Sequence, residues 1–249
     1  MNTRDEAVLR ELNLYPLWVR RSTTVADDSS LAPPVPIEAT RPVAVPAEPK
    51  LRQPESSPAS SLNWPELKQK VHDCTACKLR AGCTQTVFGV GDEKAEWLFV
   101  GEGPGADEDA QGEPFVGQAG KLLDNMLAAI KLKRGSNVYI ANIVKCRPPN
   151  NRTPEPDEIA TCLPYLQRQI ALIKPKLIIA LGKTAAASLL GRDATLGSLR
   201  GTIHQYQSPS TGETIPLIVT YHPAYLLRSP AEKAKAWQDL CFAVQRMAA

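Results

Sequence analysis

Four short apolar runs constrain the fold of this chain more than any other feature of its sequence. They are WLFVG, VYIANIV, LIIAL and LIVT, at residues 97–101, 138–144, 177–181 and 217–220. None alternates cleanly between apolar and polar residues, which predicts strands buried on both faces, as in a parallel sheet. Helical patterns follow the runs, at residues 121–130, 156–173, 184–190 and 231–247. Strands that alternate with helices predict an α/β fold, a three-layer sandwich with a central four-stranded parallel sheet.

Polar motifs lie where three of these predicted strands end. GEGPG begins at Gly101, the last residue of the first run. Asn142 lies within the second run, and the string KCRPPNNR follows that run directly. YHPAYLLR begins at Tyr221, after the fourth run. In open α/β sheets the ligand binds outside the carboxyl ends of the strands. We therefore expect one functional site, built from these three loops.

The N-terminal part of the chain has a different composition. Residues 22–61 contain eight prolines and neither glycine nor an aromatic residue. Such a segment buries too little apolar surface to offset its ordering entropy, so we predict a disordered linker. Residues 1–21 carry a helical pattern that is too short to be stable alone, so we expect a frayed terminus; the alternative is a segment that contacts the main domain or an unknown protein partner. The predicted folded domain spans residues 62–249.

Composition excludes several classes of protein. The net charge of +3 is mildly basic, which is compatible with nucleic acid but does not require it. No window of 18 uncharged apolar residues occurs, and the first residues lack the apolar core of a secretory signal. We therefore expect a cytoplasmic protein with no membrane partner, whose thiols stay reduced.

The cysteines have the spacing of metal ligands. Cys74 and Cys77 form a C-x2-C pair, and fifteen residues separate Cys146 from Cys162. Four thiolates suit a zinc ion or a [4Fe–4S] cluster, and spacing alone does not choose between them. Two more cysteines, at positions 83 and 241, are predicted to be ordinary buried residues, although position 83 is near enough to the first pair to be a rival ligand.

Three long strings carry a family resemblance. They are GEGPGADEDAQGEPFVGQAGKLLDNML from Gly101, YIANIVKCRPPNNRTPEPDE from Tyr139 and TYHPAYLLRSP from Thr220. Together with the four cysteines they resemble the iron–sulfur (family 4) uracil-DNA glycosylases of the uracil-DNA glycosylase superfamily. The resemblance covers the chain from about residue 62 to its end and implies a uracil-DNA glycosylase-like fold. It also implies a [4Fe–4S] cluster on Cys74, Cys77, Cys146 and Cys162.

The implied reaction is hydrolysis of the N-glycosidic bond of uracil in DNA, the first step of base excision repair. The base lies inside the stack, so it has to be flipped into a pocket. By resemblance, Phe115 stacks on uracil, Asn142 pairs with its edge and His222 reaches its O2 side. Main-chain groups of Glu102 and Gly103 line the pocket beside it. An amide offers one donor and one acceptor, as uracil N3–H and O4 require.

The sequence allows two routes for activation of the attacking water. A better-known branch of the superfamily has an aspartate at the position of Gly103, and here that side chain is missing. Either Glu108 or Asp109 substitutes for it, and we place Glu108 among the catalytic residues, or the sugar reacts dissociatively and water adds late. A covalent trap through a histidine is not expected, because KCRPPNNR contains none.

DNA contacts are expected around the pocket. By resemblance, Leu226 and Leu227 form an apolar wedge that fills the gap left by the flipped base. Phosphate contacts are expected from four basic residues, Lys145, Arg147, Arg152 and Arg228. The expected partner is uracil-containing DNA and the expected state is a monomer.

Two other interpretations remain open on the sequence. The missing aspartate at Gly103 suggests a non-catalytic iron–sulfur module that binds uracil or single-stranded DNA without turnover. A zinc-stapled α/β protein is the other. Because no motif places a lysine for Schiff-base chemistry, a catalytic protein would be a monofunctional glycosylase.

Overall fold

A single mixed sheet forms the centre of the folded domain. The structure, a computed structural model, describes residue 59 and residues 61–248. The described strands form one six-stranded sheet in the order β1-β3-β2-β4-β6-β5. Their bounds are Val90–Gly91 (β1), Trp97–Gly101 (β2), Val138–Asn142 (β3), Leu177–Leu181 (β4), Ile203–Gln207 (β5) and Thr214–Thr220 (β6). The four central strands, β3, β2, β4 and β6, are parallel, which confirms the predicted sheet.

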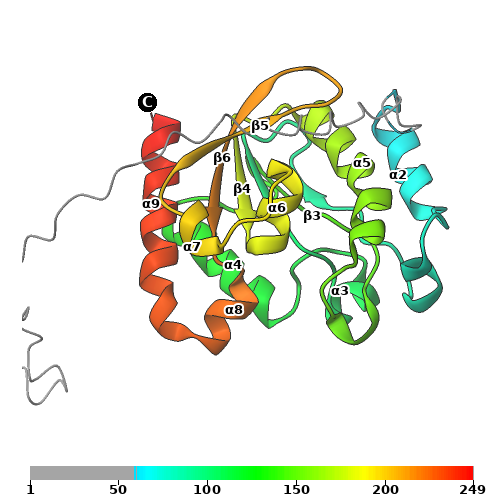
Figure 1. Ribbon diagram of the computed structural model, residues 1–249, viewed down its shortest axis with the longest axis horizontal. Helices are drawn as coiled ribbons and strands as arrows, with labels where there is room; N and C mark the ends of the chain where they lie inside the picture. Colours follow the sequence, from blue (N-terminus) through cyan, green and yellow to red (C-terminus); the bar gives the residue numbers. More distant parts are fainter. Residues whose placement is uncertain (1–58, 60, 249) are drawn as a thin grey trace, which may run out of the picture. The chain divides into compact units, whose positions relative to one another are not determined.

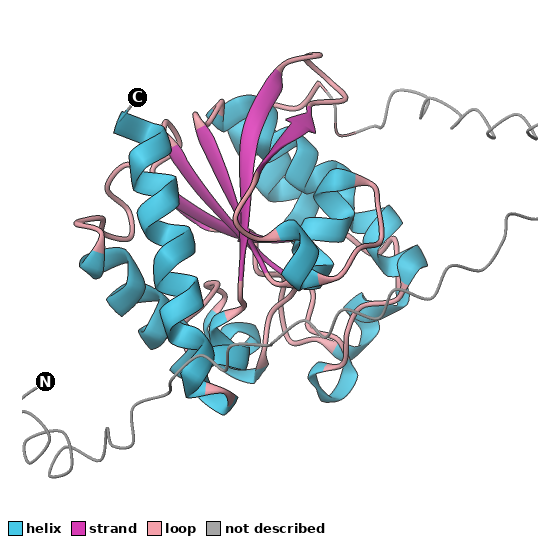
Figure 2. Cartoon of the chain, turned by 60° about the vertical axis from the view of Figure 1, so that its left-hand side comes forward, coloured by secondary structure: helices cyan, strands magenta, loops and turns pink. Residues whose placement is uncertain are grey.

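Helices cover both faces of the sheet (Figures 1 and 2). The α-helices are Trp64–His72 (α2), Ala106–Gln111 (α3), Gln118–Ala129 (α4), Pro156–Ile173 (α5), Lys183–Leu190 (α6), Leu196–Leu199 (α7), Pro223–Arg228 (α8) and Lys233–Ala248 (α9). Three 3-10 turns are Lys78–Gly82 (η1), Pro149–Asn151 (η2) and Pro230–Glu232 (η3).

Alternate residues of each central strand enter two separate apolar clusters. Leu98 and Val100 pack with α2, α5 and α6, whereas Trp97 and Phe99 pack with α4 and α9. All five residues of β2, β3 and β4 are buried, which explains why their sequences are continuously apolar. The three-layer sandwich is thus confirmed.

The edges of the sheet differ from the prediction. β1 and β5 pair antiparallel with β3 and β6, and the apolar runs predicted neither strand. β1 has only two residues, and β5 (IHQYQ) exposes most of its side chains, so neither forms an apolar run.

A residue just before the predicted domain boundary packs on the core. Ala59 is buried against the core, and its carbonyl accepts a hydrogen bond from the Leu62 amide at 3.3 Å. The predicted helical segment and most of the predicted linker lie outside the described residues. None of the helices that the structure describes is both long enough and apolar enough to cross a bilayer.

The parallel strands end together at one edge of the sheet. Gly101 pairs with Asn142, and Leu181 pairs with Thr220. The loops that follow these residues carry the polar motifs, so the register brings them to one place.

Candidate active site

A cavity of about 830 Å³ lies at the carboxyl ends of the parallel strands. Its lining comes from the loops after β2, β3, β4 and β6. All five residues predicted to bind uracil line it, namely Glu102, Gly103, Phe115, Asn142 and His222. Glu108, Arg152 and Arg228 line it as well. The sequence motifs are therefore brought together as expected.

Asn142 presents an unpaired polar atom to this site. The residue is 2% exposed, and its Oδ1 atom is buried with no hydrogen-bond partner among the described residues. A Cβ atom on Gly101 would lie 2.4 Å from Asn142 Oδ1 and 2.5 Å from Phe115 Cζ. Glycine at 101 thus lets the amide and the aromatic ring occupy the same corner. A buried amide oxygen without a partner is costly, so the site is built for a hydrogen-bond donor.

Phe115 holds its ring beside His222. The two ring centroids are 5.5 Å apart and the ring planes are inclined by 31°. The backbone of Phe115 is left-handed, with φ of 56°, a conformation that is uncommon for a bulky residue. The surrounding loop must therefore impose it.

Glu108 provides one restraint on this loop. Its carboxylate accepts hydrogen bonds from the amides of Gly105, Val116 and Gly117 at 2.9–3.1 Å. Oε1 thus accepts from the two amides that directly follow Phe115, and Oε2 accepts from the amide of Gly105. Its predicted role in activating water stays a prediction, and the geometry gives the carboxylate a second task.

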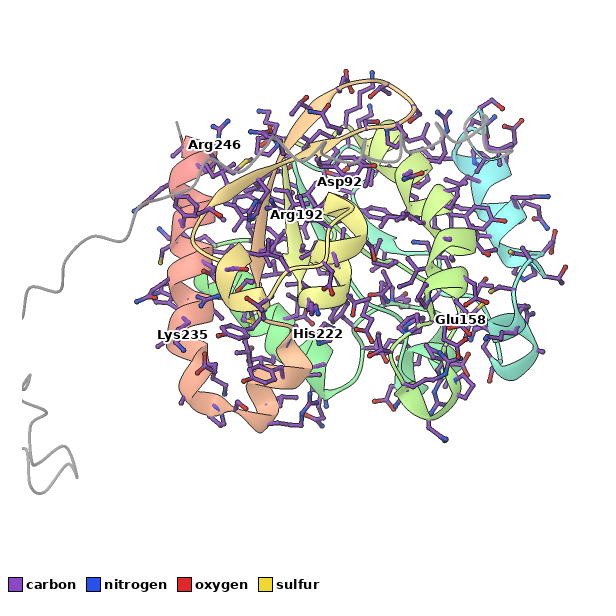
Figure 3. The ribbon with its side chains drawn as sticks, viewed as in Figure 1. Asp92, Glu158, Arg192, His222, Lys235 and Arg246 are labelled. Carbon is purple, nitrogen blue, oxygen red and sulfur yellow. The ribbon has the colours of Figure 1, made fainter. Side chains whose placement is uncertain are left out.

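His222 is the N-cap of α8, near the lower end of the ribbon in Figure 3. Its Nδ1 atom accepts a hydrogen bond from the Ala224 amide at 3.2 Å. In a neutral ring this leaves the proton on Nε2. Burial, together with the charge of Arg228, lowers the pKa of His222 to about 4, although the charge of Glu108 partly opposes this shift. The ring is therefore a neutral donor at physiological pH.

Gly103 has no room for the missing aspartate. A Cβ atom there would lie 2.8 Å from Val144 Cγ2. The same loop is tied to the end of β3, because the Val144 amide donates to the Glu102 carbonyl at 3.1 Å. A side chain at position 103 would therefore have to displace Val144 and the hydrogen bond that it makes.

The four predicted metal ligands surround a second, smaller cavity. Cys74, Cys77, Cys146 and Cys162 all line it, whereas Cys83 does not. All six cysteines are free thiols. Burial raises the pKa of Cys162 to about 11, while the charge and the amide of Lys145 partly oppose this. Within the described residues, no three His, Cys, Asp or Glu side chains are grouped closely enough to hold one metal ion.

Lys145 lies between the cysteines and the active site. Its amide donates to Cys162 Sγ at 3.2 Å, and its Nζ donates to the Asn142 carbonyl at 3.0 Å and to Gln169 Oε1 at 2.6 Å. The residue is 1% exposed, so the expectation that it contacts phosphate is wrong. Its ammonium instead satisfies the buried end of β3.

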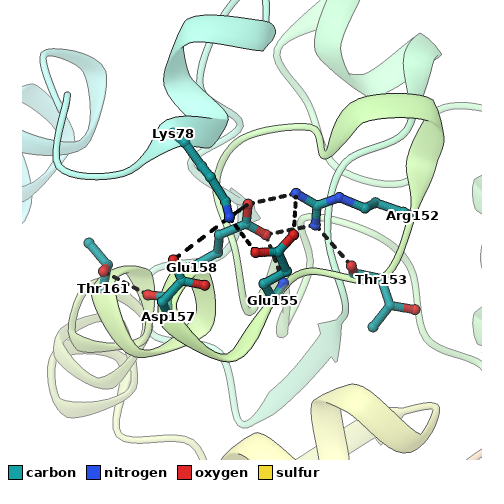
Figure 4. A network of polar contacts seen from close by, with 7 residues as sticks. All are labelled: Lys78, Arg152, Thr153, Glu155, Asp157, Glu158 and Thr161. Carbon is teal, nitrogen blue, oxygen red and sulfur yellow. Dashed lines mark hydrogen bonds and ion pairs between the residues drawn. The ribbon is translucent and has the colours of Figure 1, made fainter.

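A polar network joins the cysteine loop to the loop after β3 (Figure 4). The side chain of Glu158 is fully buried and accepts two hydrogen bonds from Arg152, at 2.7 and 2.8 Å. Lys78, which directly follows the C-x2-C pair, bonds to Glu155. The bonds from Arg152 lower the pKa of Glu158 to about 2, despite its burial. Arg152 is thus already paired, and its predicted phosphate contact remains a prediction.

The predicted wedge is only partly available for DNA. Leu226 is 1% exposed, so the prediction that it enters DNA is wrong because it packs inward. Leu227 is 44% exposed and stays a candidate. Arg228 is exposed beside the cavity, and Arg147 bonds to Asn151 Oδ1 at 2.7 Å.

Sequence reasoning missed two parts of the cavity wall. Tyr225 is 40% exposed, lines the cavity and stacks on Tyr221 with a centroid distance of 5.3 Å. Helix α6 contributes Lys183, Thr184 and Ser188. The third apolar run ends at the same edge of the sheet, so the sequence could have indicated that the segment after it, α6, lines the cavity.

Comparison with known proteins identifies the class to which this fold and site belong. Residues 88–241 match the family model of the uracil DNA glycosylase superfamily. The chain therefore belongs to that superfamily.

Its relatives specify the branch. The chain is 45% identical over 183 residues to a type-4 uracil-DNA glycosylase of Pyrobaculum aerophilum, which covers 72% of this chain and 92% of the relative. It is 45% identical over 169 residues to the type-4 enzyme of Archaeoglobus fulgidus, covering 66% and 83% of the two chains. The type-4 enzyme of Thermotoga maritima is 42% identical over 170 residues, covering 68% and 85%. The predicted resemblance to the type-4 enzymes is confirmed.

Proposed function

We propose that the cavity binds uracil flipped out of DNA and hydrolyses its N-glycosidic bond. The observation that carries this proposal is the buried, unpaired Oδ1 of Asn142, in a cavity that also holds Phe115 and His222. The type-4 relatives support the same activity. No comparison supports a non-catalytic module. We further propose that the protein acts as a monomer on uracil-containing DNA.

Asn142 reads the edge of the base. Its amide accepts from uracil N3–H and donates to uracil O4. Cytosine has an acceptor at N3 and an amino donor at position 4, so the same amide meets it with the wrong pattern. A site built to pair a specific polar edge discriminates strongly, because a mismatch leaves buried polar groups unpaired.

His222 stabilises the leaving group. When the bond breaks, its electron pair stays on uracil and the negative charge spreads toward O2. A neutral Nε2–H placed at O2 stabilises this developing charge without transferring a proton. The hydrogen bond from Ala224 to Nδ1 fixes this tautomer before DNA binds.

We propose a dissociative reaction in which water adds late. Position 103 carries no carboxylate, and the Val144 methyl leaves no space for one. The two oxygens of Glu108 already accept three main-chain hydrogen bonds. Departure of a stabilised uracil anion is therefore the demanding step; water then adds to the cationic sugar and loses a proton, which neutralises the uracil anion.

We propose that Cys74, Cys77, Cys146 and Cys162 hold the [4Fe–4S] cluster. A tetrahedral zinc ion with Zn–S bonds of about 2.3 Å would bring the sulfur atoms within about 4 Å of one another. A cluster with one thiolate on each iron spaces the sulfur atoms more widely, and the resemblance to the iron–sulfur glycosylases is what favours it over zinc. The cluster would cross-link the chain before η1, the end of β3 and helix α5. Its contribution is then structural.

An Asn142→Asp variant tests the proposed base reading. The variant keeps the size of the side chain but replaces the amide donor with an acceptor. Uracil excision should fall by a factor of about 100 or more, because a preplaced donor is lost. Excision of cytosine should become detectable, because a carboxylate accepts from its amino group. Unchanged uracil excision would refute the assignment of Asn142.

A further inference from the structure

The backbone of Phe115 is held in its left-handed conformation from both sides. On its C-terminal side, the amides of Val116 and Gly117 donate to Glu108. Behind it, Gly120 of α4 packs so closely that a Cβ atom there would lie 1.8 Å from the Phe115 carbonyl oxygen. Neither contact donates a hydrogen bond to the carbonyl groups of Pro114 and Phe115.

Arg134 engages those carbonyl groups. Its Nη1 donates to the Pro114 oxygen and its Nη2 to the Phe115 oxygen, both at 2.7 Å. Arg134 lies in the loop between α4 and β3, about twenty residues beyond Phe115 and outside the motifs of the active site. Its side chain is 20% exposed, so little water competes for these bonds.

The guanidinium is itself fixed in place. Arg134 Nε donates to Asp124 Oδ1 at 3.1 Å, from the outer surface of α4. A planar guanidinium can serve both carbonyls and the carboxylate at once, which a lysine ammonium on a flexible stem cannot do equally well. These contacts connect α4 to the Phe115 loop, and none of them reaches the cavity.

We propose that Arg134 is a positioning residue for uracil excision, which acts by fixing the backbone of Phe115. The clamp turns the Phe115 ring toward His222 and Asn142 before the base arrives. A loop without this clamp would relax from the strained conformation and move the ring. This inference rests on the proposed function, because it concerns the stacking wall of the same pocket.

A double-mutant cycle separates positioning from general support of the fold. Arg134→Met keeps much of the side-chain volume and removes the donors. Single-turnover excision of uracil should fall about tenfold to hundredfold, as expected for a misplaced binding group. In a Phe115→Ala background the same substitution should change the rate less than about twofold, because the ring through which it acts is gone. An equal loss in both backgrounds would overturn the proposal, as would full activity of Arg134→Met alone.

Matched variants control for loss of stability. Arg168 also donates from a partly buried side chain to a main-chain carbonyl, that of Leu62 at 2.5 Å, but outside the active site. Arg168→Met should leave the excision rate close to that of the wild type. Arg134→Lys should recover part of the lost rate, since an ammonium can still reach one carbonyl. A melting temperature for each variant shows whether it is folded.

Hydrogen exchange tests the clamp without relying on catalysis. Amide exchange in the peptide that spans residues 113–121 should speed up in Arg134→Met and not in Arg168→Met. Unchanged exchange in that peptide would overturn the proposal, whatever the activity. The wild type is assayed in parallel: absence of excision there would refute the proposed function, whereas the exchange result would still decide the role of Arg134.

Discussion

At the scale of single residues, the active site depends on side chains that are fixed by main-chain groups. Glu108 accepts from three amides, and His222 accepts from the amide of Ala224. Lys145 donates to the carbonyl of Asn142. Groups held in this way need little reorganisation when the base enters, which is how electrostatic catalysis gains its strength.

The neutral state of His222 predicts a pH dependence. Its pKa in the folded protein is about 4, below the value of about 6.5 in an unfolded chain. Its contribution to stability is therefore complete above about pH 6.5 and is lost as the pH falls toward 4. The excision rate should be flat from about pH 6 to 9 and should fall below about pH 5.

A variant isolates this effect from other titrations at low pH. His222→Gln keeps a neutral donor that does not titrate. Its excision rate should be lower than that of the wild type, but it should fall less at low pH, because protonation of His222 no longer contributes to the fall. The measurement is the single-turnover rate against pH for both proteins. A wild-type rate that rises as the pH falls from 7 to 5 would show that the charged ring is the active form.

At the scale of elements, the end of β3 is anchored by two neighbouring structures. One is the cavity lined by the four cysteines, and the other is the network of Lys78, Arg152, Glu155 and Glu158. Both connect the cysteine loop to α5 and to the segment after Asn142. Damage to either should reach the active site through β3.

Substitution of Glu158 tests the network. Glu158→Gln removes a buried charge whose partner Arg152 is one-third exposed, so the expected loss in the free energy of unfolding is about 2 kcal/mol at neutral pH. Because the pKa of Glu158 is lowered to about 2, its stabilisation is present above about pH 4.5 and disappears as the pH falls toward 2. Urea denaturation at several pH values measures the difference.

A surface pair provides the control for this measurement. Glu93 pairs with Lys68 at 2.7 Å, and both side chains are about half exposed. Glu93→Gln should cost less than about 0.5 kcal/mol. Equal losses for the two variants would contradict the special role given to Glu158.

Two cysteine variants test the assignment of the cluster ligands. Cys74→Ala should abolish the broad absorption at about 400 nm that a [4Fe–4S] cluster gives, and should lower the melting temperature. Cys83→Ala should retain both, because Cys83, although it contacts Cys146, lies outside the cavity that the four ligands share. Loss of absorption in Cys83→Ala would make it a ligand.

At the scale of the whole molecule, the sequence predicts the centre of the fold better than its edges. Strands that are buried on both faces have to be almost continuously apolar, so the apolar runs predicted β2, β3, β4 and β6. β5 is polar and mostly exposed, and β1 is two residues long, so pairing and not composition defines them. The carboxyl-edge location of the site followed from the parallel order alone.

Side-chain direction was the part that the sequence could not supply. Leu226 and Leu227 are the same residue type on one short helix, yet only Leu227 is exposed. Lys145 resembles its basic neighbours but points inward, toward Gln169. Arg134 donates to main-chain carbonyls, and such contacts cannot be predicted from a motif, because every residue carries a carbonyl group. These features depend on packing that only the folded chain specifies.

The most direct test of the whole account is incubation of the protein with a labelled oligonucleotide that carries one uracil, followed by alkali, with a thymine-containing control. We expect a strand break at uracil only, and only after alkali, as for a monofunctional glycosylase. A break without alkali would indicate lyase chemistry that the site does not provide. Folded, cluster-containing protein that leaves the uracil strand intact would show that this cavity does not excise uracil.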